Sequence, residues 1–258
     1  MQIALTIAGS DSGGGAGIQA DLKTFHRFGV FGTSVVTAIT AQNTLGVTRW
    51  VSVPVDMIRE QLNAVATDLR PAAVKSGMLA GAHVVTVVAD GLREHGLAPY
   101  VLDPVMVATS GDPLLTGDAV SAIRRELIPL ADLITPNLSE ASILLGEPVC
   151  DEPAMERAAR RLVEDGARAA LVKGGHLSGQ DVVDLLYDGR ELRAFRHSRI
   201  DTQSTHGTGC TLSAAITAQL ALGTPLSLAV ERAIEFVHAA IATAPGLGSG
   251  HGPLNHFA

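Results

Sequence analysis

The stretch Thr205-His206-Gly207-Thr208-Gly209-Cys210-Thr211-Leu212-Ser213 indicates both the fold and the place where a ligand binds. It follows a predicted strand at 192–197 and leads into an apolar segment, 212–222, that has no charge and no proline. This layout is typical of a glycine loop that feeds a helix, whose first turn attracts anions through unpaired N–H groups and the helix dipole. Glycine at 207 and 209 lets the backbone approach such an anion closely.

Cys210 falls in the first turn of this predicted helix. A helix dipole lowers the pKa of a thiol at that position, so the pattern predicts an acidified and reactive cysteine. The alternative interpretation is a glycine turn in which Cys210 is one more small buried side chain, a common environment for cysteine. The stretch by itself leaves both interpretations open.

Outside this stretch, strand and helix patterns alternate along the chain, which predicts a three-layer α/β/α sandwich around a mostly parallel sheet. No linker or composition break divides residues 1–258, so we expect a single domain. The predicted strands are 2–8, 33–41, 47–53, 72–75, 100–102, 133–134, 169–172, 182–186 and 192–197, the last two forming a hairpin. The predicted helices are 18–28, 55–69, 84–94, 118–127, 139–145, 153–165, 208–222 and 226–244.

Polar residues gather where the predicted strands end. In an open α/β sheet, ligands bind outside the carboxyl ends of the strands. The sequence therefore predicts one site at one edge of the sheet, built by loops that are far apart in the chain. The polar residues at these ends are Ser10, Asp11, Ser76, Asp103, Asn137, Lys173 and Thr205.

A second glycine-rich loop spans residues 9–17 and contains Gly15-Ala16-Gly17-Ile18-Gln19-Ala20, which fits a relaxed dinucleotide-binding fingerprint. That fingerprint needs an acidic residue about 20 positions further on to bind the ribose. No Asp or Glu occurs between Leu22 and Val55, which argues against a nicotinamide dinucleotide. The loop still predicts a place where a ligand meets the backbone.

The chain contains no Gly-Lys pair and therefore no Walker A loop, so phosphates need another cradle, for which the loop at 207–210 is the candidate. Lys173, one of three lysines, precedes two glycines and is either a phosphate contact or a solvated charge at a strand end. Asp103 and the segment 137–140 offer oxygen ligands that suit Mg²⁺. Their alternative role is turn and N-cap chemistry.

The amino-acid composition bears on which partners and which cellular location the protein has. A net charge of −7 and the lack of basic clusters argue against nucleic acid. No apolar run reaches the length of a membrane span, and no signal peptide is recognisable at the N-terminus. Two cysteines, Cys150 and Cys210, do not form a disulfide framework, which favours a reducing, cytoplasmic location.

Taken together, the motifs resemble those of the bacterial hydroxymethylpyrimidine/phosphomethylpyrimidine kinases, a thiamin-biosynthesis branch of the ribokinase-like superfamily. The resemblance runs from the first strand to residues 250–253, with the motifs in the expected order. It implies a homodimer that transfers phosphate from ATP with Mg²⁺, first to 4-amino-5-hydroxymethyl-2-methylpyrimidine and then to its monophosphate. The matching segments are 7–24, 40–44, 75–79, 102–106, 110–111, 133–137, 173–176 and 205–211.

The resemblance also implies roles for individual residues. Asp21 and Gln42 are expected to hydrogen-bond the pyrimidine, and Met78 and Val105 to wall its ring. Lys173, with Asn137 and Thr208, is expected to contact ATP, and Asp103 and Glu140 to help hold magnesium. The anion hole is expected from 207–210, with Gly207 and Gly209 as its glycines and Cys210 as the base.

The sequence departs from the sugar kinases of the superfamily, which carry an aspartate where Cys210 stands. A cysteine suits the pyrimidine kinases and some pyridoxal kinases, and phosphoryl transfer depends mainly on positioning and charge stabilisation. Pyridoxal kinase is thus the first alternative, although Gln42 favours the pyrimidine because an amide pairs a ring nitrogen and the adjacent amino group. A second alternative is a binder of vitamin precursors that has lost catalysis.

Overall fold

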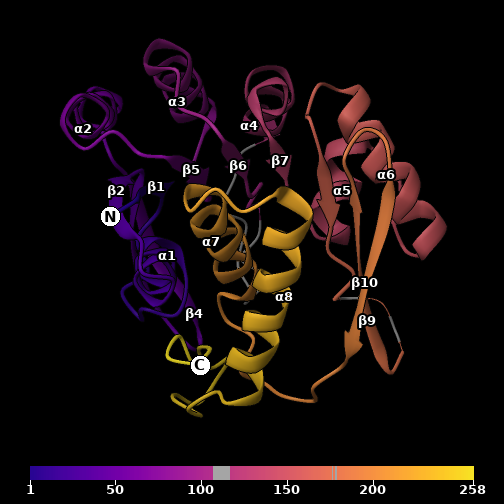
Figure 1. Ribbon diagram of the computed structural model, residues 1–258. Helices are drawn as coiled ribbons and strands as arrows, with labels where there is room; N and C mark the ends of the chain where they lie inside the picture. The colour runs from indigo at the N-terminus through magenta and orange to yellow at the C-terminus, as the bar shows by residue number, and fades with distance from the viewer. Residues whose placement is uncertain (107–116, 176, 178) are drawn as a thin grey trace.

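The centre of the protein is an eight-stranded sheet with the order β10-β9-β8-β7-β6-β5-β1-β2, drawn in Figure 1. The computed structural model describes residues 1–106, 117–175, 177 and 179–258. Seven strands are mutually parallel, and β9 alone runs antiparallel to its neighbours β8 and β10. The strands are β1 (Ile3–Ala8), β2 (Phe31–Val36), β5 (Ala73–Ser76), β6 (Tyr100–Leu102), β7 (Leu133–Ile134), β8 (Ala170–Val172), β9 (Asp181–Tyr187) and β10 (Leu192–Ser198).

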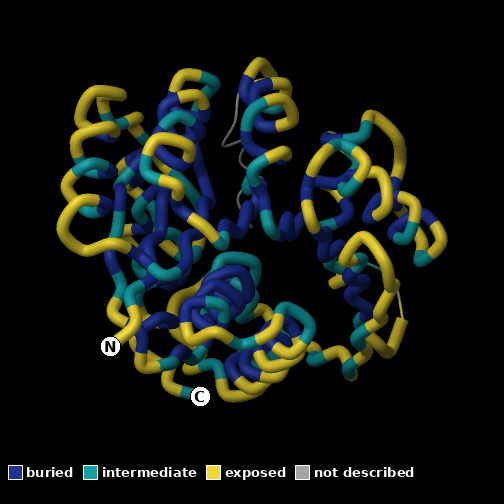
Figure 2. Tube along the Cα trace, turned by 45° about the horizontal axis from the view of Figure 1, so that its top comes forward, coloured by how far each residue is buried: buried dark blue, intermediate teal, exposed yellow. Residues whose placement is uncertain are grey.

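Helices cover both faces of the sheet, which confirms the predicted three-layer architecture. Figure 2 shows the buried strands between two rows of helices that turn their exposed sides outward. One face carries α1 (Gly17–Arg27), α7 (Thr208–Ala221) and α8 (Leu226–Ala242), which pack on one another. The opposite face carries α2 (Val55–Asp68), α3 (Ala82–His95), α4 (Gly117–Ala122), the π-helical turn η1 (Ile123–Leu127), the 3₁₀ turn η2 (Ile128–Leu130), α5 (Leu138–Leu145) and α6 (Glu152–Glu164).

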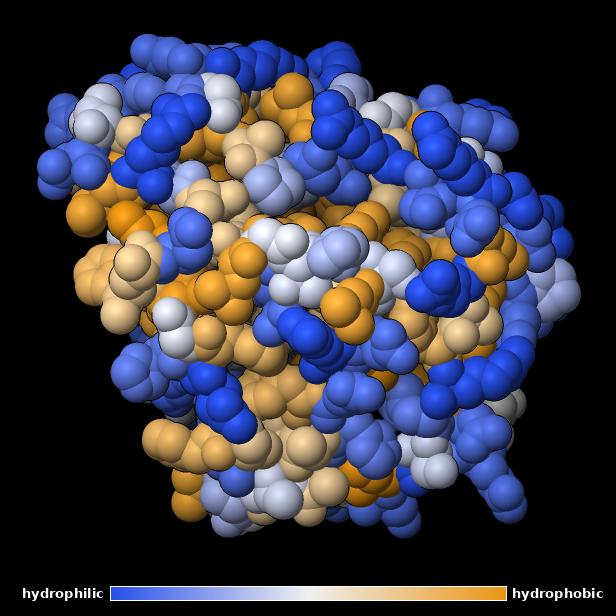
Figure 3. All heavy atoms as spheres, in the orientation of Figure 1, coloured by the Kyte–Doolittle hydropathy of each residue, from blue (hydrophilic) through white to orange (hydrophobic). Residues whose placement is uncertain are grey.

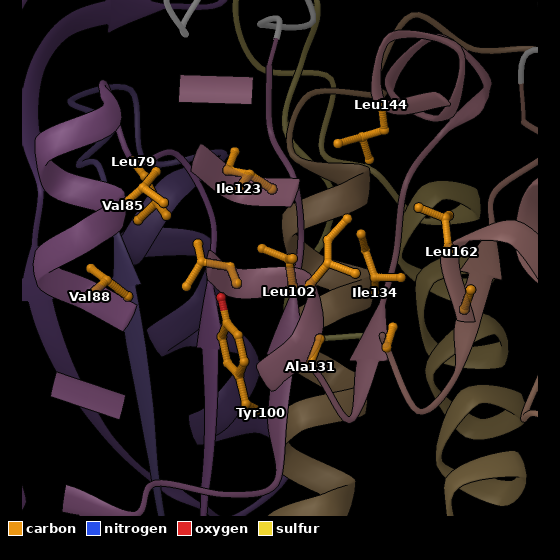
Figure 4. Close-up of a cluster of buried hydrophobic side chains, with 14 of the residues drawn as sticks. Leu79, Val85, Val88, Tyr100, Leu102, Ile123, Ala131, Ile134, Leu144 and Leu162 are labelled. Atoms are coloured by element: carbon orange, nitrogen blue, oxygen red, sulfur yellow. The ribbon is translucent and has the colours of Figure 1, made fainter. Parts of the chain in front are cut away.

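The core follows from the short, apolar central strands. Tyr100, Val101 and Leu102 of β6 are all at most 1% exposed, because helices cover this strand on both faces. Figure 4 shows Leu102 and Ile134 of the sheet beside Val85 and Val88 of α3 in one apolar layer. The α7 side of the sheet has its own layer, in which Leu133 and Leu171 pack against the helices. Burial on both faces fixes the strands and therefore the loops at their ends.

One predicted strand is wrong. The sequence predicts a single strand at 33–41, but the structure divides it into β2, in the main sheet, and β3 (Ala38–Asn43). β3 pairs with β4 (Gly46–Ser52) in a separate antiparallel hairpin. The chain turns at Thr37, whose buried hydroxyl donates to the carbonyl of Met78 while its N–H donates to Ala8. The break sends β3 away from the main sheet and toward the cavity described below.

The surface mixes apolar and hydrophilic side chains. On the face drawn in Figure 3, hydrophilic residues dominate the top and the right side, and apolar residues show in the middle and along the lower left. Among the described residues, none of the helices is both long enough and apolar enough to span a membrane. Ser110, Gly111 and His176, which belong to the matched sequence segments, lie outside the described residues.

Candidate active site

A cavity of about 600 Å³ lies at the carboxyl edge of the parallel strands. It is the single site that the strand-end pattern predicts, because loops after β1, β5, β6, β7 and β8 all reach it. Every residue predicted to bind or react lines this cavity except Asp21. The lining residues among them are Gln42, Met78, Asp103, Val105, Asn137, Glu140, Lys173, Gly207, Thr208, Gly209 and Cys210.

The two glycine loops of the sequence interlock on one side of the cavity. Asp11 is 2% exposed, and its carboxylate accepts hydrogen bonds from the backbone N–H groups of Gly13, Gly15 and Ala16. The same carboxylate lies 2.8 Å from Nε2 of His206, the residue before the second glycine loop. One carboxylate therefore shapes the first loop and ties it to the second.

Gly207 is the point of closest approach between these loops. Its φ is +82°, a left-handed conformation that favours glycine, and it forms the N-cap of α7. A Cβ at this position would overlap the carbonyl of Gly15. The position thus requires glycine for two reasons. The first turn of α7 lines the cavity at Thr208, Gly209 and Cys210, and a helix N-terminus at such a wall attracts anions.

Lys173 lies beside this anion-binding turn. An ideal Cβ at Gly209 would lie 3.2 Å from Nζ of Lys173, so the lysine reaches the loop because residue 209 has no side chain. The ammonium lies 3.0 Å from Oδ1 of Asp103 and 3.9 Å from Oε2 of Glu140. Cation, carboxylates and helix N-terminus therefore meet at one place, as transfer of a charged phosphoryl group requires.

The charges of this cluster support one another. Burial alone would lower the pKa of Lys173, but Asp103 and Glu140 outweigh it and raise that pKa, so the ammonium stays charged. Burial opposes ionisation of Asp103 as well, yet Lys173, Lys75 and the Ser213 hydroxyl hold its pKa below the ordinary value. Burial raises the pKa of Glu140 to about 7, because Lys173 only partly offsets it.

Asn137 and Glu140 also perform the helix-capping role that the sequence left as an alternative. The side chain of Asn137 accepts from the N–H of Glu140 at 2.9 Å, and the Glu140 carboxylate accepts from the N–H of Asn137 at 2.8 Å. This reciprocal capping box begins α5. An isolated bridge pairs Asn137 with Lys173, so the cap lies directly beside the lysine.

Gln42, Met78 and Val105 gather at the end of the cavity near the β3–β4 hairpin. Met78 and Val105 pack in a small apolar cluster with Ala38, Ala80 and Trp50. Gln42 lies at the β-bulge of β3, with Nε2 3.4 Å from Nε2 of His206. An amide above an apolar wall suits a flat heteroaromatic ring that carries hydrogen-bonding groups on one edge.

Asp21, which is predicted to hydrogen-bond the pyrimidine, lies behind the wall of the cavity. It is 0% exposed and does not line the cavity. Its two carboxylate oxygens bind inward, Oδ1 to Nζ of Lys75 at 2.8 Å and Oδ2 to the hydroxyl of Thr6 at 2.6 Å. Lys75, 54 positions away in the sequence, thus occupies this carboxylate, and the role of Asp21 toward the pyrimidine stays a prediction.

The predicted acidification of Cys210 is wrong in direction. Cys210 does lie in the first turn of α7 and at the cavity wall. However, burial raises the pKa of its thiol to about 12, with Asp21 and Asp103 adding to the rise and Lys75 opposing it. Desolvation of the thiolate thus exceeds the effect of the helix dipole that the sequence analysis used.

The far end of the cavity was not predicted from the sequence. Its walls include the apolar residues Leu212, Ile234 and Val237 of the two helices α7 and α8. Asp184, which is 5% exposed, and His197 face this end, with His197 Nε2 4.0 Å from Asp184 Oδ2. His197 follows the strand-end rule, so a signal for it existed in the sequence, whereas Asp184 lies inside an antiparallel strand.

The cluster of a lysine, two carboxylates and a helix N-terminus suits phosphoryl transfer. The sheet and its solved relatives are those of the ribokinase-like class of small-molecule kinases. The sequence profile of the phosphomethylpyrimidine kinases matches residues 11–255. The chain therefore belongs to the phosphomethylpyrimidine kinase family.

Known relatives agree with this assignment. The hydroxymethylpyrimidine/phosphomethylpyrimidine kinase of Rhizobium meliloti strain 1021 is 55% identical over 99% of this chain and 97% of its own. The phosphomethylpyrimidine kinase of Clostridium difficile 630 is 40% identical, with a TM-score of 0.84 over 93% of this chain and 100% of its own. The pyridoxal kinase of Bacillus subtilis, solved as an ADP complex, is also 40% identical, with a TM-score of 0.93 over 99% of this chain and 97% of its own.

Proposed function

We propose that the protein transfers the γ-phosphoryl group of ATP to the hydroxymethyl group of 4-amino-5-hydroxymethyl-2-methylpyrimidine. In a second reaction it transfers the γ-phosphoryl group of another ATP to the resulting monophosphate, which gives the diphosphate. The observation that carries the proposal is the order of groups along one cavity. Gln42 and its apolar wall lie at one end, and Lys173, Asp103 and the anion-binding turn of α7 lie next to it. A pyrimidine held by Gln42 presents its alcohol to a phosphate held by that turn.

In the reaction, the alcohol oxygen attacks the γ-phosphorus, a new P–O bond forms and the bond to the β-phosphate oxygen breaks, which releases ADP. Cys210 takes the proton of the alcohol as the general base. Lys173, Asn137 and Thr208 bind the phosphates, and the N–H groups at 207–210 stabilise the charge that develops on the transferred group. The pyridoxal kinase of B. subtilis was solved as an ADP complex, which supports ATP as the phosphate donor.

Asp103 and Glu140 fit Mg²⁺ bound together with ATP. Among the described residues, no three His, Cys, Asp or Glu side chains converge as a metal cage. Two carboxylates next to a phosphate site are instead the sparse protein set that Mg²⁺ uses when phosphate oxygens and water complete its shell. When bound, the ion neutralises phosphate charge, while the chain's own residues position both substrates.

The far end of the cavity is assigned to the nucleoside of ATP. Leu212, Ile234 and Val237 form an apolar surface for a base. Asp184 and His197 supply polar groups for the donors of a nucleoside. This assignment leaves the Gln42 end for the pyrimidine and brings the two substrates together at Lys173.

A turnover comparison tests the function. We expect the purified protein to consume ATP with the aminopyrimidine alcohol and with its monophosphate, and much more slowly with pyridoxal. Pyridoxal turnover equal to or above that of the pyrimidine would favour the pyridoxal kinase alternative. We consider this alternative because several of the similar solved structures are pyridoxal kinases. No ATP consumption with either alcohol would favour the non-catalytic binder.

We further propose one kinase domain spanning residues 1–258, a cytoplasmic location and a homodimer. The β3–β4 hairpin and the start of α2 leave Ile39, Val51, Val55 and Met57 between 41% and 56% exposed, which supports an interface there. Light scattering behind size exclusion tests the dimer. Ile39→Lys in the hairpin should shift the mass toward that of a monomer.

A further inference from the structure

Gln42 stands in the cavity wall with a fixed backbone and a side-chain amide that lies between two polar groups. Its N–H donates to Oγ of Ser12 at 2.8 Å, and that hydroxyl donates to the carbonyl of Gln42 at 2.7 Å. One end of the amide lies 3.4 Å from Nε2 of His206, and the other end lies 3.4 Å from Oγ1 of Thr40. The donor end and the acceptor end of an amide have nearly the same shape, so these two neighbours decide which way it points.

The neighbour at the His206 end of the amide is a hydrogen-bond donor. Nε2 of His206 lies 2.8 Å from the carboxylate of Asp11, which also accepts from the N–H groups of Gly13, Gly15 and Ala16. Burial opposes ionisation of Asp11, but its hydrogen bonds to His206 and to the backbone hold its pKa below the ordinary value. An ionised carboxylate can only accept, so Nε2 of His206 carries a hydrogen in either charge state of the ring. The amide therefore faces the N–H edge of this ring.

The neighbour at the Thr40 end of the amide is an acceptor. Oγ1 of Thr40 lies 2.8 Å from the carbonyl of Ser10, which takes the only hydrogen of that hydroxyl and leaves its lone pairs toward Gln42. Both ends therefore require one orientation, with the amide oxygen toward His206 and the amide NH₂ group toward Thr40. With Nε2 beside His206 instead, two N–H groups would face each other. Half a turn about the last side-chain bond of Gln42 removes that conflict.

We infer that His206, fixed by Asp11, is a positioning residue that acts through Gln42 and sets the order of donor and acceptor that the cavity recognises. One hydrogen and one lone pair of the amide are used within the protein, so one of each is left for a ligand. The ligand must present its donor on the His206 side and its acceptor on the Thr40 side. The inference rests on the proposed pyrimidine substrate, whose 4-amino group and adjacent ring nitrogen supply this pair.

The first test observes the amide directly by nuclear magnetic resonance and needs no ligand. In protein that is isotopically labelled at glutamine, the side-chain amide signal of Gln42 is the one that disappears in Gln42→Leu. Its two hydrogens should show stronger nuclear Overhauser contacts to the methyl group of Thr40 than to the ring hydrogens of His206. Stronger contacts to the His206 ring would place the NH₂ group at that end and would overturn the inference.

The second test measures discrimination between two ligands by titration calorimetry. The 4-oxo analogue of the pyrimidine alcohol presents an acceptor and a donor in the inverse order. Wild type should bind the amino compound about tenfold or more tightly than this analogue, because the analogue leaves buried polar groups unpaired. His206→Leu lets the amide turn, so the ratio of the two affinities should fall by about fivefold or more. His206→Gln, whose terminal NH₂ group can donate to Asp11 and to Gln42, should restore most of the ratio.

The ratio separates positioning from a structural role. If His206 only supported the loops, His206→Leu would weaken both ligands equally, and that unchanged ratio would contradict the inference. Should this variant fail to fold, Thr40→Val removes the acceptor at the other end of the amide and should lower the ratio as well. Thr48→Val, at an exposed position of β4, is the matched control and should leave the ratio unchanged. Failure of both pyrimidines to bind would remove the proposed substrate, while the resonance contacts would still decide the direction of the amide.

Discussion

The carbonyl oxygen of Gly15 occupies the space that a side chain at Gly207 would need. This contact joins the loop after β1 to the loop before α7, two segments separated by most of the chain. It holds the anion-binding turn against the loop that lies next to Gln42. The alignment of the two substrates therefore depends on glycine at position 207, because a side chain there would push the two loops apart.

Gly207→Ala should reduce both stability and turnover. A left-handed residue other than glycine costs about 1–2 kcal/mol, and the clash with Gly15 must in addition move one of the loops. Gly223→Ala is the matched control, because φ is +81° there but nothing lies within 4 Å of the added Cβ. Thermal unfolding and turnover of both variants separate the two effects. Equal losses would mean that the contact between the loops is unimportant.

Gln42→Leu should weaken binding of the pyrimidine without affecting ATP. The substitution leaves a buried polar edge of the ligand unpaired, which costs about 1–3 kcal/mol, or about tenfold or more in affinity. Titration calorimetry with each substrate measures this. Gln61→Leu, on α2 and outside the cavity, is the control for loss of an amide. Unchanged pyrimidine affinity would remove Gln42 from the binding site.

Lys173→Met should raise the KM for ATP and lower kcat together. A charged hydrogen bond to phosphate contributes about 1.5–3 kcal/mol, so a combined loss in kcat/KM of at least tenfold is expected. Steady-state kinetics at varied ATP measures it. A change in the KM of the pyrimidine alone would place Lys173 at the wrong end of the cavity.

Asp103→Asn should increase the magnesium concentration that gives half-maximal rate. The neutral amide keeps the shape of the buried side chain but is a poorer ligand for a hard cation. A magnesium titration of activity at saturating ATP measures the shift. Glu156→Gln, on the exposed face of α6, is the control carboxylate. If both variants show the wild-type magnesium dependence, Asp103 serves only to hold Lys173.

Cys210→Ala should lower turnover by about 10²–10⁴-fold, the usual contribution of a general base. Because burial raises the pKa of the thiol to about 12, the thiolate fraction of the wild type grows tenfold per pH unit between pH 6 and 9. Wild-type kcat/KM should therefore rise with pH over this range, and the Ala variant should lose that rise. Near-wild-type turnover with the same pH profile would mean that water or the substrate handles the proton.

Periodicity and turn residues were sufficient to predict nearly all strands and helices and the edge at which the site lies. The predicted strand at 33–41 failed because its β-branched residues continue through Thr37, where tertiary hydrogen bonds, and no local signal, turn the chain. The strand-end rule found Asp103, Asn137 and Lys173 because their strands are parallel. The rule missed Asp184 because β9 is antiparallel to its neighbour β8.

Burial and long-range pairing account for two further features that the sequence did not reveal. Nothing near Asp21 in the sequence indicates that Lys75 neutralises it, since their contact depends on β5 lying beside β1 under α1. The pKa of Cys210 was predicted from a helix dipole, which the sequence reveals. The opposing desolvation depends on packing, which the sequence does not reveal.

The scarcity of lysine gives this protein an unusual response to amine chemistry. Lys75 is 0% exposed and Lys173 is only 14% exposed, and each ammonium is held by a carboxylate. The exposed amines are thus Lys23 and the terminus at Met1, which is 96% exposed. An amine-reactive dye or a surface linker will therefore attach at two places: at the amino end of β1, and beside the first glycine loop, where Nζ of Lys23 donates to the carbonyl of Gly14. A linker confined to the terminus at Met1, at the edge of the sheet opposite the cavity, should consequently leave the cavity open to both substrates.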